Sequence, residues 1–366
     1  MKIEDILKVL ENFASPSLQE DYDNAGLITG NLQWECTGVL ISLDATESVL
    51  EEAAQQKCNL VIAHHPIIFK GLKKINGNNY IERTVIYAIK NDIAIYAIHT
   101  NLDNILHGVN DRIAMQLGLK KTRILKPKPL LLRKLAVFVP ADHQEHLLET
   151  LFLAGAGNIG KYRECSFRLE GVGSFTPGDG SKPYFGETNK RSVEKEVKIE
   201  VIYPYWREGQ ILSAMFKNHP YEEVAHDIYT LQNSYQETGS GLIGELENSI
   251  SEDELLSLLQ VRFGTPCIKH TQLRGKMVKK IALCGGTGSF LLQSAIDLNA
   301  DVYITSDLKY HEYFDADSNI LLADIGHYES EQFTVDLLFD LLRQKFLNFA
   351  VLKTSVQTNP VYYFTR

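Results

Sequence analysis

The spacing of apolar residues changes along the chain and predicts which segments are helices and which are strands. Apolar side chains three or four positions apart predict an amphipathic helix over residues 3–13. Continuous apolar runs predict buried strands over residues 39–44, 60–63 and 93–98, and a helical pattern over 46–56 separates the first two. Strands that alternate with helices in this way are typical of a parallel α/β sheet.

The pattern is interrupted at residues 126–129, where two lysines and two prolines favour a linker. After the linker the predicted order is strand, helix, strand, strand, helix, strand, which is the order of a ferredoxin-like α+β domain. The α/β pattern then returns and continues toward the end of the chain. We therefore predict an α/β protein with a two-part core, residues 1–126 and 246–366, and a ferredoxin-like domain inserted between them at 127–245.

The composition is that of an ordinary globular protein, with 44% hydrophobic and 23% charged residues. The net charge of -9 argues against a nucleic-acid partner and against attraction to anionic membranes. The chain begins with an acidic amphipathic segment where a signal peptide would be basic, and its apolar runs are shorter than the ~20 residues of a membrane span. Its five cysteines lie far apart without a CxxC pair, so we expect a reducing, cytoplasmic location.

Two adjacent histidines, His64 and His65, directly follow the strand predicted over residues 60–63, and Pro66 comes after them. Ligands bind beyond the carboxyl ends of strands in open α/β sheets, and neutral imidazole is the commonest metal ligand near neutral pH. The pair therefore indicates either a metal site or a turn whose histidines face water.

Further candidate ligands occur elsewhere in the chain. His327 and Glu331 are four residues apart at the start of a helix predicted over residues 326–344, so both side chains lie on one face of it. Asp103 follows another predicted strand, four residues after His99. An oxygen ligand among imidazoles suits Zn, Mn or Fe(II) in an open site better than a structural zinc site rich in thiolates.

Together His64, His65, Asp103, His327 and Glu331 offer three nitrogens and two carboxylates. Five ligands are too many for one tetrahedral site with an open position. Two ions roughly 3.5–4 Å apart could share one carboxylate and a water that acts as the nucleophile.

Several other polar residues each have more than one possible role. His99 is a candidate acid/base or metal-supporting residue, or a hydrogen-bonded histidine at a strand end. His311 and Lys309 follow a predicted strand and are candidates to bind phosphate, to orient a ligand or, for His311, to shuttle a proton. The glycine-rich loop 285–289 is either an anion site or a packing turn, and Asp23 fits a simple turn.

Six separated motifs, in this order, resemble the GTP cyclohydrolase 1 type 2 homologues, also called NIF-three-like proteins. They are DNAGL at 23–27, HHPIIF at 64–69, HTNLD at 99–103, CGGTGS at 284–289, SDLKYH at 306–311 and HYESE at 327–331. The resemblance covers essentially the whole chain, and the insert resembles the PII and CutA-like module of the longer bacterial members. It implies a dinuclear metal site on His64, His65, Asp103, His327 and Glu331, with Glu331 bridging, in a ring-shaped homohexamer.

Two functions are compatible with this resemblance. The first is a hydrolase that uses two divalent ions (Zn, Fe or Mn) on a small purine-like or phosphorylated substrate, a nucleotide being one candidate, with His99 or His311 moving the proton. The family name suggests opening of the GTP imidazole ring. The second is a non-enzymatic metal-binding regulatory assembly in which the inserted domain senses a ligand.

Overall fold

The computed structural model describes residues 1–364, and the chain divides into two compact units. The core unit consists of Met1–Lys126 together with the residues from Glu237 onward, and the insert unit consists of Pro127–Gln236. Among residues 1–364, no helix is both long enough and apolar enough to cross a lipid bilayer.

The first sheet of the core unit has the strand order β1-β4-β3-β2-β15. Four of its strands are parallel and β1 pairs antiparallel with β4, so the predicted parallel α/β sheet is correct for all but this edge. The strands are β1 (Gly26–Thr29), β2 (Val39–Asp44), β3 (Leu60–His65), β4 (Ala94–Ala97) and β15 (Val351–Lys353), and the helices that belong with them are α1 (Ile3–Phe13), α2 (Glu47–Gln55) and α3 (Tyr80–Lys90).

The second sheet of the core unit has the order β11-β14-β13-β12-β10-β5, with β12, β13 and β14 parallel and β10 and β11 antiparallel to their neighbours. Its strands are β5 (Lys120–Pro127), β10 (Gly239–Ser251), β11 (Lys269–His270), β12 (Met277–Thr287), β13 (Val302–Ser306) and β14 (Leu321–Asp324). The remaining helices of this unit are α4 (Thr100–Asp103), α5 (Val109–Leu117), α8 (Glu252–Phe263), α9 (Leu292–Asp297), α10 (His327–Glu331) and α11 (Thr334–Lys345).

The single helix predicted over residues 326–344 is wrong, because the structure has two helices there, α10 and α11. The side-chain amide of Gln332 donates to the carbonyl of Glu329 at 3.0 Å. In an unbroken helix that carbonyl would accept the N–H of residue 333. The break separates the short first helix, which carries HYESE, from the apolar second one.

Each sheet packs its buried residues into its own hydrophobic cluster. Leu40, Val61 and Ile95 belong to the cluster on the first sheet, and Ala282 and Tyr303 to that on the second. Those of the first sheet come from the apolar runs that predicted its strands, and removal of such side chains from water is the main force that holds both sheets in place.

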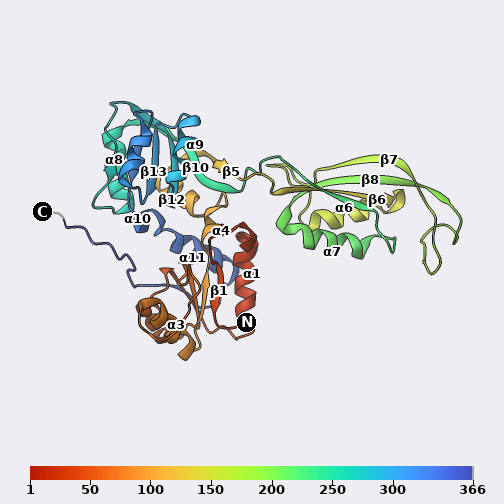
Figure 1. Ribbon diagram of the computed structural model, residues 1–366, viewed down its shortest axis with the longest axis horizontal. Coiled ribbons are helices and arrows are strands. Elements are labelled where there is room, and N and C mark those ends of the chain that lie inside the picture. Colours follow the sequence, from red (N-terminus) through yellow and green to blue (C-terminus); the bar gives the residue numbers. More distant parts are fainter. Residues whose placement is uncertain (365–366) are drawn as a thin grey trace. The chain divides into compact units, whose positions relative to one another are not determined.

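The insert unit contains an antiparallel sheet of order β7-β8-β6-β9. Along the chain the order is β6 (Leu132–Pro140), α6 (Gln144–Leu153), β7 (Ser166–Phe175), β8 (Ser192–Pro204), α7 (Glu208–Asn218) and β9 (His226–Thr230). Both helices lie on one face of this sheet (Figure 1) and bury a cluster that includes Leu135, Leu148 and Ile211. The chain therefore has a mixed α/β fold with several sheets.

Candidate metal centre

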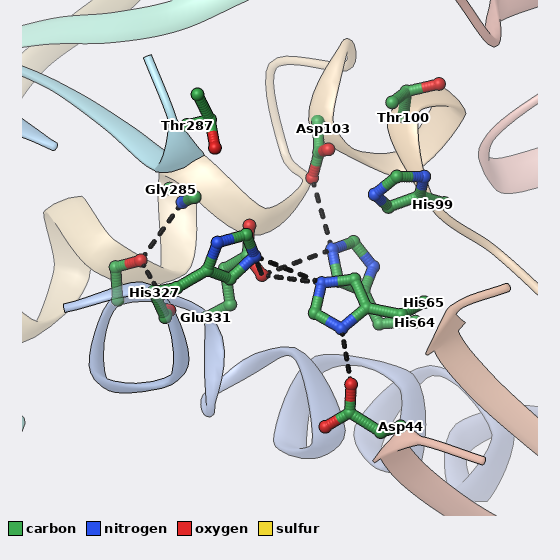
Figure 2. Close-up of polar contacts among 12 residues, drawn as sticks. Asp44, His64, His65, His99, Thr100, Asp103, Gly285, Thr287, His327 and Glu331 are labelled. Atoms are coloured by element: carbon green, nitrogen blue, oxygen red, sulfur yellow. Dashed lines mark hydrogen bonds and ion pairs between the residues drawn. The ribbon is translucent and has the colours of Figure 1, made fainter. Parts of the chain in front are cut away.

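The candidate ligands lie at the carboxyl ends of strands from both sheets of the core unit. His64 and His65 are the last two residues of β3, and Asp103 ends α4, which follows β4. His327 and Glu331 begin and end α10, which follows β14 of the second sheet. Figure 2 shows these five side chains pointing toward one another.

Glu331 lies at the middle of this group. Its Oε2 atom is 2.9 Å from His65 Nε2, 3.0 Å from His327 Nε2 and 3.9 Å from His64 Nε2. The Nε2 atoms of His65 and His327 are 3.3 Å apart. Asp103 Oδ1 completes the group, 3.6 Å from His64 Nε2.

The Nδ1 atom of each histidine is held by an acceptor on the side away from Glu331. His64 Nδ1 lies 2.8 Å from the carbonyl oxygen of Ile98, His65 Nδ1 lies 2.8 Å from Asp44 Oδ1, and His327 Nδ1 lies 2.6 Å from Asp307 Oδ2. An acceptor at Nδ1 keeps a proton on that nitrogen, so Nε2 is the atom that can bind a metal ion once it carries no proton, which is the usual arrangement of metal-binding histidines.

Known proteins resemble this chain over most of its length. Residues 1–360 match the family described as Duf34/NIF3 (NGG1p interacting factor 3). The chain belongs to this family. The resemblance predicted from the six motifs is therefore confirmed.

Several members of the family are similar over nearly their whole length. A GTP cyclohydrolase 1 type 2 homolog from Bacillus subtilis is 39% identical over 327 residues, which are 88% of this chain and 87% of the relative. Another, from Halalkalibacterium halodurans, is 37% identical over 360 residues, 97% of each chain. The crystal structure of a Bacillus cereus protein related to NIF3 matches with a TM-score of 0.88 at 35% identity, covering 100% of this chain and 99% of that one.

Two buried polar atoms test whether the residues of this Duf34/NIF3 chain fit a metal ion. Among residues 1–364, His64 Nε2 and Asp103 Oδ1 have no hydrogen-bond partner although both atoms are shielded from solvent. A buried polar atom without a partner costs about 1–3 kcal/mol, and a cation between the two atoms would satisfy both of them. Together with the carboxylate of Glu331, these two atoms form a set of nitrogen and oxygen donors that fits a divalent ion.

Within the described part of the chain, three overlapping groups place one ligand atom per residue within 4.8 Å of one another. They are His65, His327 and Glu331; His64, Asp103 and Glu331; and His64, His65 and His99. The predicted ligands therefore lie together, although they come from segments more than 200 positions apart.

In the metal-free protein, the pKa of His64 is lowered, whereas the pKa values of His65 and His327 are raised. Burial lowers the pKa of His64 to about 3, which keeps its Nε2 free to bind a cation. Burial also opposes a charge on His65, but hydrogen bonds to Asp44 and Glu331 raise its pKa to about 10. For His327, burial is likewise outweighed by Glu331 and Asp307, which raise the pKa to about 11.

The pKa values of the two candidate carboxylate ligands, Glu331 and Asp103, are shifted in opposite directions. Burial alone would raise the pKa of Glu331, but His327 and His65 hold it well below its usual value, so this group is ionised. Burial and the neighbouring Glu331 raise the pKa of Asp103 well above its usual value. Bringing a divalent cation to this group would remove the repulsion between the two carboxylates.

His99 lies beside the ligands, and its ring is held by Asp23. His99 Nδ1 lies 2.8 Å from Asp23 Oδ1, and the other carboxylate oxygen accepts the N–H of Thr100 at 3.0 Å and its hydroxyl at 2.5 Å. Burial opposes ionisation of Asp23, but its bonds to His99 and Thr100 lower its pKa to about 2. Asp23 therefore does more than form the turn predicted for it.

The remaining candidates either lie away from the ligand atoms or already make hydrogen bonds within the protein. His311 is exposed on a 3-10 segment, η5 (Tyr310–Ala316), where its ring contacts Tyr310 and Phe314. A cavity lies beside the candidate ligands, with His65, Asp103, His327 and Glu331 in its wall, and His311 is not among its described lining residues. In the glycine-rich loop, the Gly285 N–H donates to Asn110 Oδ1 and the Gly286 N–H donates to Ser330 Oγ. These bonds favour the packing-turn interpretation of the loop.

The sequence did not point to Asp44 or Asp307, whose carboxylates hold two of the histidines. Asp44 ended a predicted strand and Asp307 lay within the SDLKYH motif, so both had the right position along the chain. The missing information was strand register, because the pairing of β2 with β3 sets Asp44 directly beside His65.

Proposed function

We propose that this chain is a dinuclear metal-dependent hydrolase whose ions are bound by His64, His65, Asp103, His327 and Glu331. The observation that carries the proposal is that Glu331 belongs to two ligand groups, one with His65 and His327 and one with His64 and Asp103. A carboxylate shared by two such groups is the arrangement expected of a bridging ligand.

Bound ions would supply Lewis-acid chemistry by lowering the pKa of a water and neutralising charge that develops on the substrate. The chain's own contribution to proton transfer is His99. Asp23 holds its Nδ1 side, and Nε2 is left to accept a proton or return it to the leaving group. We omit His311 from this role because it does not line the cavity.

The lining of the cavity supports a substrate with a flat apolar part. Its volume is about 1270 Å³. Seven of the residues that line it are acidic, and Lys269 is the only lysine or arginine among its described lining residues. Exposed aromatic side chains that can stack on a flat ring lie along it. These are Tyr22, Phe69, Tyr80 and Phe290. Two divalent ions bound at the centre would offset four of these negative charges, so a phosphate group beside the ions is compatible with this wall, and the aromatic side chains favour a purine-like ring.

Turnover by protein loaded with Zn, Mn or Fe(II) tests the proposal. The candidate substrates are purine bases, their nucleosides, and the matching nucleoside mono- and triphosphates, together with cyclic amides and phosphoesters. We expect hydrolysis of a purine-like ring compound that stops on chelation and falls at least about 100-fold in His99→Gln. A matched control is His107→Ala, because His107 also pairs with a carboxylate, Asp111, but is 74% exposed on the surface.

Three outcomes separate the candidate functions. Metal binding that is lost in Glu331→Gln, combined with turnover that needs metal, supports the hydrolase. Metal binding without turnover of any compound in the panel supports the regulatory assembly. Wild-type protein that binds no metal under any loading condition contradicts both proposals.

We also propose a domain type for the insert unit and an oligomeric state for the protein. The chain order of the insert and its sheet order β7-β8-β6-β9 support a ferredoxin-like domain of the PII and CutA kind that senses a ligand. The exposed ring cluster of Tyr310 and Phe314 supports a homo-oligomer, for which we propose the ring-shaped hexamer in the cytoplasm. Light scattering on purified protein would measure the number of subunits.

A further inference from the structure

The segment that follows β15 forms part of the cavity wall next to the candidate ligands. Residues 354–363 contain neither helix nor strand. Five of them line the cavity, namely Thr358, Asn359, Pro360, Val361 and Tyr363. Glu52 of α2 fixes the start of the segment, because its carboxylate accepts the hydroxyl of Thr354 and, at 2.9 and 2.7 Å, the N–H and hydroxyl of Ser355.

Thr358 contacts the carboxylate that holds His65. The Thr358 hydroxyl donates to Asp44 Oδ2 at 2.6 Å, while Asp44 Oδ1 accepts the Nδ1–H of His65 at 2.8 Å. Each oxygen of the carboxylate therefore has its own partner. Without the bond from Thr358, the Asp44 carboxylate could rotate about its Cβ–Cγ bond and the imidazole would lose a fixed orientation.

Asn359, the next residue, contacts the helix that carries the other two ligands. Its side-chain amide donates to Glu329 Oε1 at 3.1 Å. Glu329 is only 6% exposed and lies on α10 between His327 and Glu331. Asp44 belongs to the first sheet, and α10 follows the second. Thr358 and Asn359 therefore connect the ligands from the first sheet with those on α10.

We infer that Thr358 and Asn359 form a C-terminal clamp that positions His65 and α10 for metal binding. This inference rests on the proposed metal centre and adds to it two positioning residues, neither of which belongs to the candidate ligand groups. The clamp acts on the group of His65, His327 and Glu331. The bonds of Thr358 and Asn359 to Asp44 and Glu329 are separate from the bond between His64, a ligand of the other group, and the carbonyl oxygen of Ile98.

The test is the affinity for Zn²⁺ alone, measured in competition with a chelator of known affinity. Loss of a residue that supports a ligand weakens metal binding by about 10–100-fold. Thr358 acts through one more residue, so we expect Thr358→Val to weaken the ion at the His65 group by about 3–30-fold. Thr358→Ser, which keeps the hydroxyl, should bind like wild type. Asn359→Ala should weaken the same ion, and Tyr362→Ala is the control, because Tyr362 is 92% exposed in the same segment.

A double-mutant cycle separates positioning from loss of packing. If Thr358 acts through Asp44, then Asp44→Asn with Thr358→Val binds no more weakly than Asp44→Asn alone. The effect of Thr358→Val should persist in an Asp103→Asn background, which retains the His65 group. It should vanish in a His327→Ala background, where that group is broken.

Thermal unfolding of the metal-free variants shows whether each one folds. If wild type binds Zn²⁺ and both Thr358→Val and Asn359→Ala bind it equally well, the clamp is overturned and the metal centre stands. Additive losses in the cycle also overturn it, because they show that Thr358 acts independently of Asp44. If wild type binds no Zn²⁺, the metal centre and the clamp both fail.

Discussion

The Nε2 atoms of His65 and His327 lie 3.3 Å apart, although 262 positions separate the two residues in the sequence. One histidine ends a strand of the first sheet and the other begins a helix that follows the second. Two imidazole nitrogens this close to the same carboxylate oxygen are arranged for a shared cation. The predictions below test the consequences of this convergence.

Removal of single ligands should change the number of bound ions in a defined way. Because Glu331 belongs to both ligand groups, Glu331→Gln should lose both ions. His327→Ala should lose one ion, and Asp103→Asn should lose the other. Elemental analysis of dialysed protein measures the ratio of metal to protein. If Glu331→Gln retained one ion per chain, the shared carboxylate would be ruled out.

Metal binding should release protons and strengthen as the pH rises. With a pKa of about 10 for His65 and about 11 for His327, both imidazoles carry a proton at pH 7 in the metal-free protein. A cation can bind only the neutral ring, so each proton displaced makes the affinity about tenfold higher per pH unit. Calorimetry with Mn²⁺ at pH 6–8, in buffers of different ionisation enthalpy, counts the protons. An affinity that did not change over this range would contradict the prediction.

Gly286→Ala should disrupt the metal centre. Gly286 has a φ of 60°, and a Cβ atom there would collide with Glu331 Oε1. Gly264→Ala is the matched control, because its φ is 64° but its Cβ would meet nothing within 4 Å. Both variants should lose about 1–2 kcal/mol of unfolding free energy from the left-handed backbone. Only Gly286→Ala should also lose metal affinity, which a Zn²⁺ titration measures; equal affinities would refute the argument.

Asp23→Asn should destabilise the metal-free protein by about 1–3 kcal/mol, since an amide nitrogen would face donors that the carboxylate now satisfies. The pKa of Asp23 is lowered to about 2, so its contribution is complete above its ordinary pKa of 3.8 and is lost as the pH falls through 2. Urea unfolding at pH 7 and pH 3 should show a smaller difference from wild type at the lower pH. Asp21→Asn, at an exposed neighbour, should have little effect at either pH. A difference that grew on acidification would argue against this role.

Replacement of the insert unit by a short glycine-serine linker should leave metal binding intact. The strands that flank it, β5 and β10, are neighbours in the second sheet, and Leu125 packs beside Gly241. The two chain ends are therefore close enough to be joined. Circular dichroism and elemental analysis would show a folded core that binds the same number of ions as the full chain. Loss of metal in a folded deletion variant would mean that the insert contributes to the centre.

Much of the fold could be predicted because apolar periodicity is a local property. The helix predicted over 3–13 is α1, and the apolar runs at 39–44 and 93–98 correspond to β2 and β4. Three strands of the second sheet, β5, β10 and β11, were not predicted. Their sequences are rich in lysine or interrupted by glycine, and their partners rather than their composition make them strands.

The sequence by itself determined the ligand types and their places at the ends of strands and at the start of a helix, because four-residue spacing and strand termini can be recognised within a short window. Only the tertiary structure decided that these ligands meet around Glu331 and that Asp44, Asp307 and Asp23 hold the rings of three histidines. It also decided that Thr358 lies against Asp44, 314 positions earlier in the chain. Such contacts depend on strand register and on the packing of segments far apart in the sequence, which local spacing does not encode.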